Sequence, residues 1–366
     1  MRILILNWRD IRNPMSGGAE VLTDALAKQL VQRGHPVTLF TSSFPDASAE
    51  ENIDGVTVIR RGQWWNVQIW AFFYYTFSFH NPIDVIIDEV HWFPFFSVLY
   101  ARKKTVLLVC EVARRFFFRL FPFPLAFVGR TIEKFYFFLN RSVPVLAISP
   151  STKHDLIEEG IDEANIIVLP MGLTVPKRIK HHPKDTTTTL LFVGRLHSLK
   201  GVVDAIEAFA LIRHDLSSVK LWIVGAGTAS YVETLRKRIK LLKLINHVQL
   251  LGYLQEKDKF ERYQKAHLLI VPSFHEGWGL VVAEAASQGT PAVAYNTAGL
   301  RDVIVDGVTG VLVKSNTPGS LATTAVELLK NKKEYRLLQQ AGMQRAKEMS
   351  WDKTATSALA VLQSTL

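Results

Sequence analysis

The chain has 366 residues, of which 48% are hydrophobic and 21% are charged, and its formal net charge is +10. This composition is typical of a folded globular protein and argues against disorder, while the length favours two domains. The single cysteine, Cys110, excludes an intramolecular disulfide framework and fits a reducing cytosol.

Short apolar runs alternate with amphipathic helical patterns along most of the chain, which is typical of a parallel α/β architecture. The first buried strand is predicted at ILILN (3–7), whose four apolar residues before Asn7 are too few for the core of a signal peptide. A helix follows, with apolar residues at helical spacing from Leu22 to Leu30 and with Gly34 after its C-cap. The other strands expected in this half are PVTLFT (36–41), VTVIR (56–60), DVIID (84–88), TVLLV (105–109) and VLAIS (145–149).

The first half ends with a helix and a linker. The helix is predicted to start at a cap formed by Ser149 or Ser151 and to end at Gly160. The polar, unpatterned stretch HHPKDTTTT (181–189) follows, and we place the linker at 176–189.

The strand and helix pattern then starts again. Its expected strands are LLFVG (190–194), KLWIVG (220–225), HLLIVP (267–272) and PAVAY (291–295). Two successive βαβ units with separate starts predict two Rossmann-like domains that face each other across a deep cleft. We place the N-terminal domain at 1–175 and the C-terminal domain at 190–350, and we expect a last helix, at about 352–366, to cross back onto the first domain.

One aromatic run has no charged residue. It extends from Gly62 to Ile83, and its apolar core, Ile69 to Phe79, is about half as long as the ~20 residues of a membrane-spanning helix. The run therefore predicts a buried or interfacial helix.

Two glutamates, Glu276 and Glu284, lie in HEGWGLVVAEAASQGTPAVAYNTAG (275–299) after the strand HLLIVP. Ligands of a doubly wound sheet bind at the carboxyl ends of its strands. Gly277 and Gly279 let the backbone approach a ligand closely, and a helix that begins near Gly279 aims its N–H groups at a phosphate. A carboxylate placed there can accept two hydrogen bonds from a vicinal diol such as that of ribose. The alternative is that Glu284 is a solvated helix residue, although its small neighbours suit a helix packed on both sides.

A second group of residues supports a ligand site. Arg195 follows the first strand of this half in VGRLHSLKG, and Lys200 starts the next helix. Two cations that converge on one strand-end loop suit a diphosphate, although either could be surface decoration. Gly225, in VGAG (224–227), adds a third glycine-bearing strand end, a weak signal because the dinucleotide fingerprint is incomplete.

The run EGWGLVVAEAASQGTPAVA resembles the E-x7-E signature of GT-B glycosyltransferases, in particular family 4 of the retaining type. The supporting matches, in the expected order from the first strand to about Val313, are SGGAE (16–20), GRLHSLKG, GAG and AGLRDVIVDGVTGVLV (298–313). The resemblance implies the GT-B fold, with two Rossmann-like domains. It also implies transfer of a hexose-type sugar from a nucleotide diphosphate sugar to a glycan or lipid-linked acceptor in cell-envelope or polysaccharide biosynthesis.

The resemblance also assigns roles to individual residues. Glu276 would hold hydroxyls of the transferred sugar and Glu284 those of ribose, while Arg195 and Lys200 would neutralise the diphosphate. Glu276, Arg195 and Lys200 are accordingly the expected catalytic residues, together with His91. The other expected donor-binding residues are Gly17, Gly18, Gly225, Gly277, Trp278, Gly279 and Leu280. No metal or other cofactor is expected, since these positive groups stabilise the leaving nucleotide diphosphate, and the anomeric configuration is expected to be retained.

The chain departs from the family pattern at one position. Similar proteins commonly have a histidine where this chain has Cys110, after the strand TVLLV. A buried thiol cannot replace imidazole in hydrogen bonding, and the nearest candidate for the role is His91, in DEVHWFPFF. The departure leaves a non-catalytic sugar-nucleotide-binding homologue as the alternative function.

The segment 100–141 holds the densest positive charge, with nine Lys or Arg residues against two Asp or Glu residues. Its cations include Arg102, Lys103, Lys104, Arg114, Arg115, Arg119 and Arg130, and its phenylalanines include Phe116 to Phe118, Phe121, Phe123 and Phe127. A basic, aromatic, non-spanning segment suits the surface of an anionic membrane, so 102–130 could bring the enzyme to a lipid-linked sugar. The alternative is that these rings pack against the aromatic run at 70–79. Nucleic acid is not an expected partner, and the expected location is cytoplasmic, with peripheral attachment to the inner face of the membrane.

Overall fold

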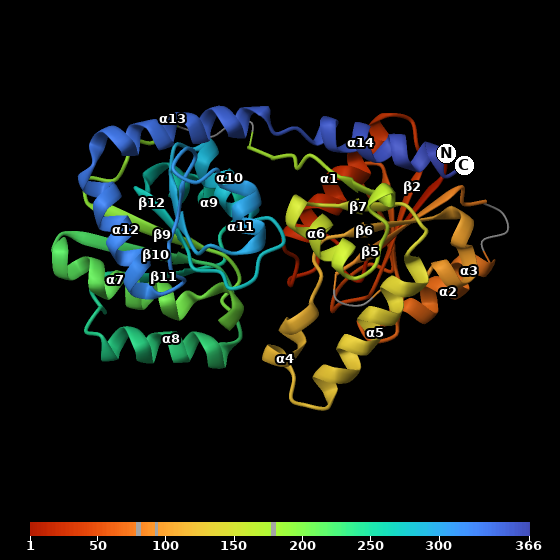
Figure 1. Ribbon diagram of the computed structural model, residues 1–366, viewed down its shortest axis with the longest axis horizontal. Coiled ribbons are helices and arrows are strands. Elements are labelled where there is room, and N and C mark those ends of the chain that lie inside the picture. The colour runs from red at the N-terminus through yellow and green to blue at the C-terminus, as the bar shows by residue number, and fades with distance from the viewer. Residues whose placement is uncertain (78–81, 92–93, 177–180) are drawn as a thin grey trace. The chain divides into compact units, whose positions relative to one another are not determined.

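The computed structural model describes residues 1–77, 82–91, 94–176 and 181–366 (Figure 1). The chain divides into two compact units: unit 1 contains residues 1–172 and 350–366, and unit 2 contains residues 173–349. Each unit is an α/β layer structure with a largely parallel sheet, as the two separate starts of the strand pattern predicted.

Unit 1 is built on an eight-stranded sheet of order β3-β4-β2-β1-β5-β6-β7-β8. All neighbouring strands are parallel except β3 and β4, which are antiparallel. The strands are β1 (Ile3–Leu6), β2 (Val37–Thr41), β3 (Glu50–Ile53), β4 (Val56–Arg60), β5 (Val85–Val90), β6 (Thr105–Val109), β7 (Val145–Ala147) and β8 (Ile166–Val168).

The helices of unit 1 are α1 (Gly18–Gln32), α2 (Val67–Phe77), α3 (Val98–Ala101), α4 (Phe117–Leu120), α5 (Leu125–Asn140), α6 (Pro150–Glu158) and α14 (Trp351–Ser364), with 3-10 turns η1 (Arg102–Lys104), η2 (Arg114–Phe116) and η3 (Glu163–Asn165). Ser149 caps α6, because its hydroxyl accepts a hydrogen bond from the backbone N–H of Thr152 at 3.0 Å.

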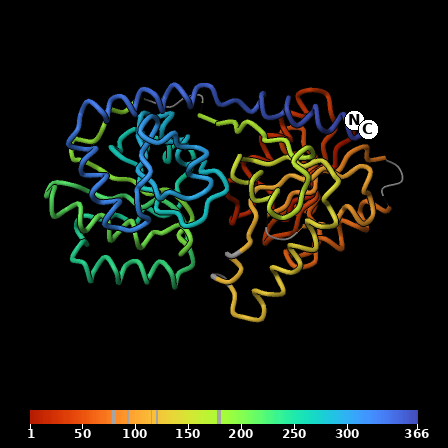
Figure 2. The backbone as a smooth tube through the Cα atoms, in the orientation of Figure 1, coloured from red at the N-terminus to blue at the C-terminus, as the bar shows by residue number. Residues whose placement is uncertain are grey.

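The last helix of the chain returns to unit 1. Figure 2 shows α14, in blue, running beside α1, in red. Arg33 Nη2 lies 2.6 Å from Asp352 Oδ1, and the hydroxyl of Thr354 donates to the carbonyl oxygen of Pro170 at 2.5 Å. These contacts attach the C-terminal helix to the first Rossmann-like layer.

Unit 2 is built on a parallel six-stranded sheet of order β11-β10-β9-β12-β13-β14. Its strands are β9 (Thr188–Val193), β10 (Val219–Val224), β11 (Val248–Gly252), β12 (Leu268–Val271), β13 (Ala292–Ala294) and β14 (Val311–Leu312). Its helices are α7 (Val202–Asp215), α8 (Ala229–Leu241), α9 (Glu256–Lys265), α10 (Leu280–Ser287), α11 (Ala298–Val303), α12 (Pro318–Lys330) and α13 (Lys332–Glu348), with the 3-10 turn η4 (Ser198–Lys200).

Part of the segment expected as a linker packs onto unit 2. Lys184 Nζ donates to the carbonyl oxygen of Ala266 and to the hydroxyl of Thr290, and β9 begins two residues before the expected strand. Residues 177–180 of that segment lie outside the described residues.

The strand order of unit 2 determines where a ligand site can form. β9 lies between β10 and β12, so the connection after β9 goes to one side of it and a later connection returns to the other. In open α/β sheets the crevice for a ligand lies at this switch point, outside the carboxyl ends of the two strands. The loops after β9 and β12 therefore emerge next to each other at that edge.

Candidate active site

The switch point of unit 2 brings together two residues that the sequence singled out. Lys200 ends η4 after β9, and Glu276 lies in the loop after β12. Lys200 Nζ lies 2.8 Å from Glu276 Oε2, and both side chains are partly buried. A charge-assisted hydrogen bond of this length fixes the ammonium and the carboxylate relative to each other.

The backbone holds these two loops in contact. Gly201, at the start of α7, has φ +66°, and a Cβ on it would lie 2.1 Å from the carbonyl oxygen of Pro272. The backbone N–H of Phe274 donates to the carbonyl oxygen of Leu199 at 2.9 Å. Glycine is therefore required at this position, because any side chain would separate the turn with Lys200 from the loop with Glu276.

Arg195 and Gly225 lie at the ends of β9 and β10 beside this pair. Arg195 is exposed, and its charge adds to that of Lys200 in lowering the pKa of His197, a shift that arises first from burial of the imidazole. A Cβ on Gly225 would lie 1.8 Å from the carbonyl oxygen of Gly194, so the two strand ends approach as closely as glycine allows. Both cations thus lie close enough to His197 in this strand-end loop to lower its pKa.

Glu284 lies in the second turn of α10 and is only 8% exposed, so it is not a solvated surface residue. Its Oε1 accepts from Lys259 Nζ at 2.9 Å, and its Oε2 accepts from the hydroxyl of Tyr263 at 2.7 Å. Both donors come from α9, and sequence reasoning identified neither of them. A carboxylate has about four acceptor positions, so two remain for a ligand.

The start of α10, where the sequence predicts the backbone amides that bind phosphate, is a left-handed glycine turn. Gly279 is its N-cap with φ +96°, Leu280 is its first residue and the neighbouring Trp278 is buried. A Cβ on Gly299, in α11, would lie 2.2 Å from the carbonyl oxygen of Glu276 and 2.6 Å from the carbonyl carbon of Gly277. This contact supports the loop from behind and leaves little space for it to shift.

At the carboxyl edge of unit 1, the glycines after β1 are held by a buried acid. Gly17 is the N-cap of α1 and Gly18 its first residue. The backbone N–H of Gly17 donates to Glu20 Oε2 at 2.6 Å, while Glu20 Oε1 pairs with Arg9 Nε at 3.0 Å. The glycine turn is therefore tied to the chain that leaves β1.

A buried polar cluster lies below this edge, and sequence reasoning did not identify it. Glu89, in β5, accepts from Asn7 Nδ2 at 2.7 Å and from the hydroxyl of Thr23. Burial raises the pKa of Glu89 to about 8. Cys110 Sγ lies 3.5 Å from Glu89 Oε1, and burial, together with the charge of Glu89, raises the pKa of the thiol. Cys110 is thus a small buried residue, as expected.

His91 follows β5 and is buried at the same edge. Its ring lies edge-on to that of Trp8, with 5.9 Å between the centroids, and its Nε2 lies 3.7 Å from Glu111 Oε1. The neighbouring Trp92 and Phe93 lie outside the described residues. Across the described ranges, no group of three or more His, Cys, Asp or Glu side chains is arranged to hold a metal ion.

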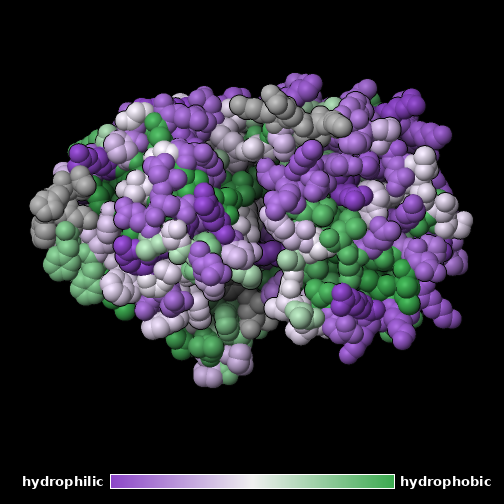
Figure 3. Space-filling model, turned by 180° about the vertical axis from the view of Figure 1, so that it is seen from behind, coloured by the Kyte–Doolittle hydropathy of each residue, from purple (hydrophilic) through white to green (hydrophobic). Residues whose placement is uncertain are grey.

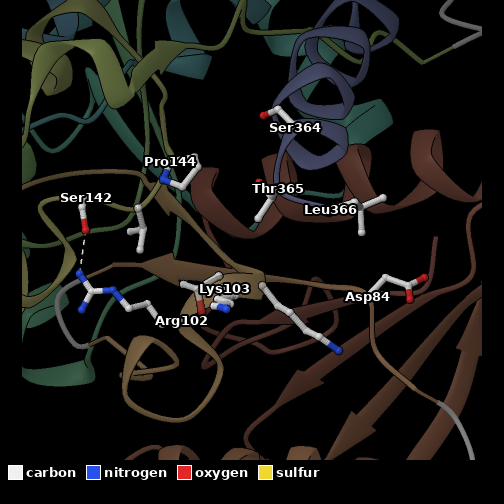
Figure 4. Close-up of a pocket in the computed structure, with 11 residues that line it drawn as sticks. Asp84, Arg102, Lys103, Ser142, Pro144, Ser364, Thr365 and Leu366 are labelled. Atoms are coloured by element: carbon white, nitrogen blue, oxygen red, sulfur yellow. Dashed lines mark hydrogen bonds between the residues drawn. The ribbon is translucent and has the colours of Figure 1, made fainter.

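A cavity of about 730 Å³ lies at the other edge of the unit 1 sheet (Figure 4). Its lining includes Asp84, Lys104 and Pro144, which precede β5, β6 and β7, so it opens at the amino ends of the strands. Arg102 and Lys103 also line it, and the guanidinium of Arg102 donates to Ser142 Oγ at 2.7 Å. The cavity is therefore separate from the carboxyl edge at which the expected site residues lie.

The cations of the basic segment have different environments. Arg114 pairs with Asp155 and Glu158, and Arg130 pairs with Glu133 and with Glu159. These two arginines are therefore neutralised within unit 1 and are not free charges of a membrane surface. Arg102 and Lys103 are exposed, and the side chains of Arg115 and Arg119 lie outside the described part.

The phenylalanines of the basic segment do not all enter the core. Phe117 is buried, whereas Phe118, Phe121, Phe123 and Phe127 are 36% to 76% exposed. Ring contacts join residues of α2 to one another, to Phe40 of β2 and to Tyr100 of α3. Most of these phenylalanines are therefore at the surface of unit 1, whereas Phe117 packs in a buried cluster with Ala113 and Ala126.

Both halves of the chain are similar to known protein families. Residues 16–175 match the family described as Glycosyltransferase Family 4, and residues 176–345 match the family described as Glycosyl transferases group 1. The chain is 30% identical over 217 residues to the D-inositol 3-phosphate glycosyltransferase of Geodermatophilus obscurus, a match covering 55% of this chain and 48% of the relative. The chain spans about half the length of the curated relatives that it matches, with shares from 23% to 61%.

Solved structures resemble the chain over nearly its whole length. Sucrose-phosphate synthase from Thermosynechococcus elongatus superposes with a TM-score of 0.81 at 18% identity, covering 99% of this chain and 98% of that one. Anabaena HepE in complex with UDP and glucose superposes with a TM-score of 0.75 at 18% identity, covering all of both chains. These likenesses confirm the GT-B fold expected from the sequence.

Proposed function

The chain belongs to the GT-B glycosyltransferases of family 4 and group 1, and we propose that it transfers a hexose from a nucleotide diphosphate sugar to a glycan or lipid-linked acceptor. The observation that carries this proposal is the Lys200–Glu276 pair at the switch point of unit 2. A cation for the diphosphate and a carboxylate for sugar hydroxyls are held there within hydrogen-bond distance.

In this proposal unit 2 binds the donor. Lys200 and Arg195 neutralise the diphosphate, helped by the backbone amides around Trp278, Gly279 and Leu280 at the start of α10. Glu276 accepts hydrogen bonds from hydroxyls of the sugar, and Glu284 accepts those of ribose with its two remaining positions. Lys200 keeps its bond to Glu276 when the donor binds, because an ammonium has three donors.

Transfer then needs no metal ion. The bond between the anomeric carbon and the leaving phosphate oxygen breaks, and the negative charge that develops on the diphosphate lies beside Lys200 and Arg195. The acceptor hydroxyl attacks from the same face, its proton goes to the leaving phosphate oxygen, and the anomeric configuration is retained.

Unit 1 binds the acceptor in this proposal, with Gly17 and Gly18 completing the site for the diphosphate. His91 lies at the edge where the acceptor would enter, and it takes the part of the histidine that Cys110 replaces. The enzyme would act in cell-envelope or polysaccharide biosynthesis, at the cytoplasmic face of the membrane. The alternative is a non-catalytic sugar-nucleotide-binding homologue. It is favoured by the presence of Cys110 at the position where similar proteins commonly have a histidine.

The test begins with the donor. Because Anabaena HepE was solved with UDP and glucose, UDP-glucose is the first candidate in a thermal-shift screen that also contains GDP and ADP sugars. With the donor that binds, Lys200→Ala and Glu276→Ala should each lose transfer by about 10² to 10³-fold. Lys240→Ala, an exposed lysine of α8, is the matched control.

Three outcomes are informative. Full activity in either site variant, or abolition of transfer by a chelator, would contradict the proposed chemistry. Donor binding without hydrolysis or transfer for every acceptor would favour the non-catalytic homologue.

A further inference from the structure

Unit 1 carries many exposed apolar side chains on the outer sides of α2, α3 and α5, which we call the aromatic face. Its members, 37% to 66% exposed, are Ile69, Trp70, Phe72, Phe73 and Phe77 of α2, Leu99 of α3, and Leu125, Phe127, Val128, Ile132, Phe135 and Phe138 of α5. In Figure 3 hydrophobic side chains gather at the left and lower margins of unit 1, where α2 and the α4–α5 segment lie.

The aromatic face cannot turn inward, because the inner sides of the same helices already form the core. Val67 and Ala71 of α2 and Ala101 of α3 pack with strand residues in one cluster, and Tyr136 and Phe137 of α5 do so in the next. Helices that are apolar on both sides are typical of a core or a membrane rather than of a protein–water boundary.

Ring contacts connect the three helices beneath the aromatic face. The ring of Tyr100, in α3, lies 5.3 Å from that of Phe72 and 5.4 Å from that of Tyr75, both in α2. The ring of Phe96, just before α3, lies 5.4 Å from that of Tyr136 in α5. Single exposed apolar side chains are normal on a monomer, whereas twelve of them on three adjoining helices indicate a binding partner.

Exposed cations border the aromatic face. Arg102 and Lys103 directly follow α3, Lys134 lies on α5 and Arg141 is its C-cap residue. The guanidinium of Arg141 lies 4.9 Å from the ring centroid of Phe138, so charge and aromatic surface meet there. These cations differ from Arg114 and Arg130, which are paired within unit 1.

Few carboxylates lie near these cations in the sequence, although Asp84 lines the same cavity as Arg102 and Lys103. Between residues 98 and 141 the sequence has two, Glu111 and Glu133. Glu133 is buried, where it accepts from the backbone N–H groups of Ala113 and Arg114 and pairs with Arg130. The segment that supplies these cations therefore carries a net positive charge, which suits an anionic surface.

From this arrangement we infer that the aromatic face docks unit 1 onto an anionic phospholipid bilayer, with α2 and α5 lying in the plane of the headgroups. Among the described residues no helix is long and apolar enough to cross a membrane, so the attachment is to one leaflet. The aromatic rings enter the headgroup region, while Arg102, Lys103, Lys134 and Arg141 contact lipid phosphates. This inference extends the proposed function, on which it rests for the lipid-linked acceptor.

Vesicle flotation tests the inference with the full chain. Binding to phosphatidylcholine vesicles that contain phosphatidylglycerol is expected at low salt, with weaker binding to phosphatidylcholine alone and at high salt. The double variant Arg102→Glu/Lys103→Glu should weaken binding by at least about fivefold for each cation lost. The reason is that each cation near an anionic membrane contributes about 1 kcal/mol to the binding free energy. Lys237→Glu/Lys240→Glu, in the exposed part of α8, is the charge-matched control.

A second pair of variants tests how much the apolar side chains contribute to vesicle binding. Phe73→Ser/Phe135→Ser should weaken vesicle binding by more than tenfold, whereas Leu241→Ser, at a side chain 70% exposed on unit 2, should leave it unchanged. Hydrogen exchange with and without vesicles is the second readout, since protection is expected in peptides of α2 and α5 and not in those of α8.

Vesicle binding and the proposed sugar transfer can fail independently, and the measurements distinguish the two. Donor hydrolysis in the absence of lipid should be the same for the face variants and the wild type, and a protein that binds vesicles but transfers no sugar would contradict only the proposed function. Absence of vesicle binding at low salt would overturn the inference. Dimerisation without lipid, lost in Phe73→Ser/Phe135→Ser, would instead assign the aromatic face to a second copy of the chain.

Discussion

Glu284 of α10 is held from one side by Tyr263 of α9, whose hydroxyl donates to Glu284 Oε2 at 2.7 Å. The contact fixes the carboxylate near the start of α10 while its other acceptor positions stay available. The proximity of Glu284 also raises the pKa of Tyr263, after burial, which keeps the phenol protonated as a donor. The sequence left open a solvated helix residue as the alternative for Glu284, and the burial of its side chain excludes that alternative.

The first prediction concerns this contact. Tyr263→Phe leaves Glu284 Oε2 without a buried donor, so the free energy of unfolding should fall by about 1–3 kcal/mol and the KM for the donor should rise more than kcat falls. Urea unfolding and initial rates at varied donor concentration measure the two effects.

Tyr335→Phe is the matched control in the same unit, because its hydroxyl donates to the carbonyl oxygen of His267 at 2.8 Å and does not touch Glu284. It should lose stability without a change in KM. Equal KM values for the two variants would contradict the proposal that Glu284 binds the ribose.

The second prediction concerns Gly299, whose Cβ in Gly299→Ala would lie 2.2 Å from the carbonyl oxygen of Glu276. The loop must shift to admit the methyl group, at a cost of about 1–3 kcal/mol, and the carboxylate moves with it. Transfer activity should therefore fall at least tenfold while circular dichroism stays native.

Gly319→Ala provides the comparison, since no atom lies within 4 Å of its Cβ position in α12. Activity should be unchanged and stability equal or slightly higher, as for an alanine in a helix. If both variants keep full activity, the position of the Glu276 loop does not limit the reaction.

The elements missed by sequence reasoning have a common physical origin. β3, β8, β11 and β14 are the strands not expected, and each lies at an edge of its sheet. An edge strand has a partner on one side only and need not be apolar on both faces. β3 has the sequence EENI and is exposed or half-buried over its first three residues. The interior strands, buried on both faces, carry the continuous apolar runs that make parallel strands recognisable.

Some residues of the candidate site could be predicted from the sequence and others could not. Lys200 and Glu276 could be predicted because each lies beside a glycine in a strand-end loop, a pattern visible within ten residues. The donors to Glu284 come from α9, and Glu89 lies within an apolar strand, so only the fold brings these groups to their partners. Local patterns therefore identify residues in strand-end loops better than the partners that the fold brings to them from other elements.

The third prediction compares His91 with Cys110. His91→Ala should lower kcat far more than it changes the affinity for the donor, because the imidazole lies in unit 1, at the edge proposed for the acceptor. Cys110→Ala removes only a weak donor to Glu89 and should be mild. Steady-state kinetics with both substrates varied measures the effects, and the opposite ranking of the two variants would mean that His91 does not replace the family histidine.

The last prediction is a dependence of stability on pH that arises from Glu89. The pKa of this carboxyl is raised from 4.5 to about 8 in the folded protein, first by burial and then by the charge of Glu20, while the charge of Arg9 and the donors Thr23 and Cys110 oppose the shift. Between these two pH values the folded protein holds a proton that the unfolded chain has released, so stability falls as pH rises from about 4.5 to about 8, by up to about 1.4 kcal/mol per pH unit. Glu89→Gln keeps the shape and one donor group but cannot titrate, and its free energy of unfolding should vary less over this range. Urea unfolding at pH 5, 6.5 and 8 measures the difference. A wild type and a Glu89→Gln variant with parallel pH profiles would show that Glu89 is ionised in the folded protein, balanced by the buried donors around it.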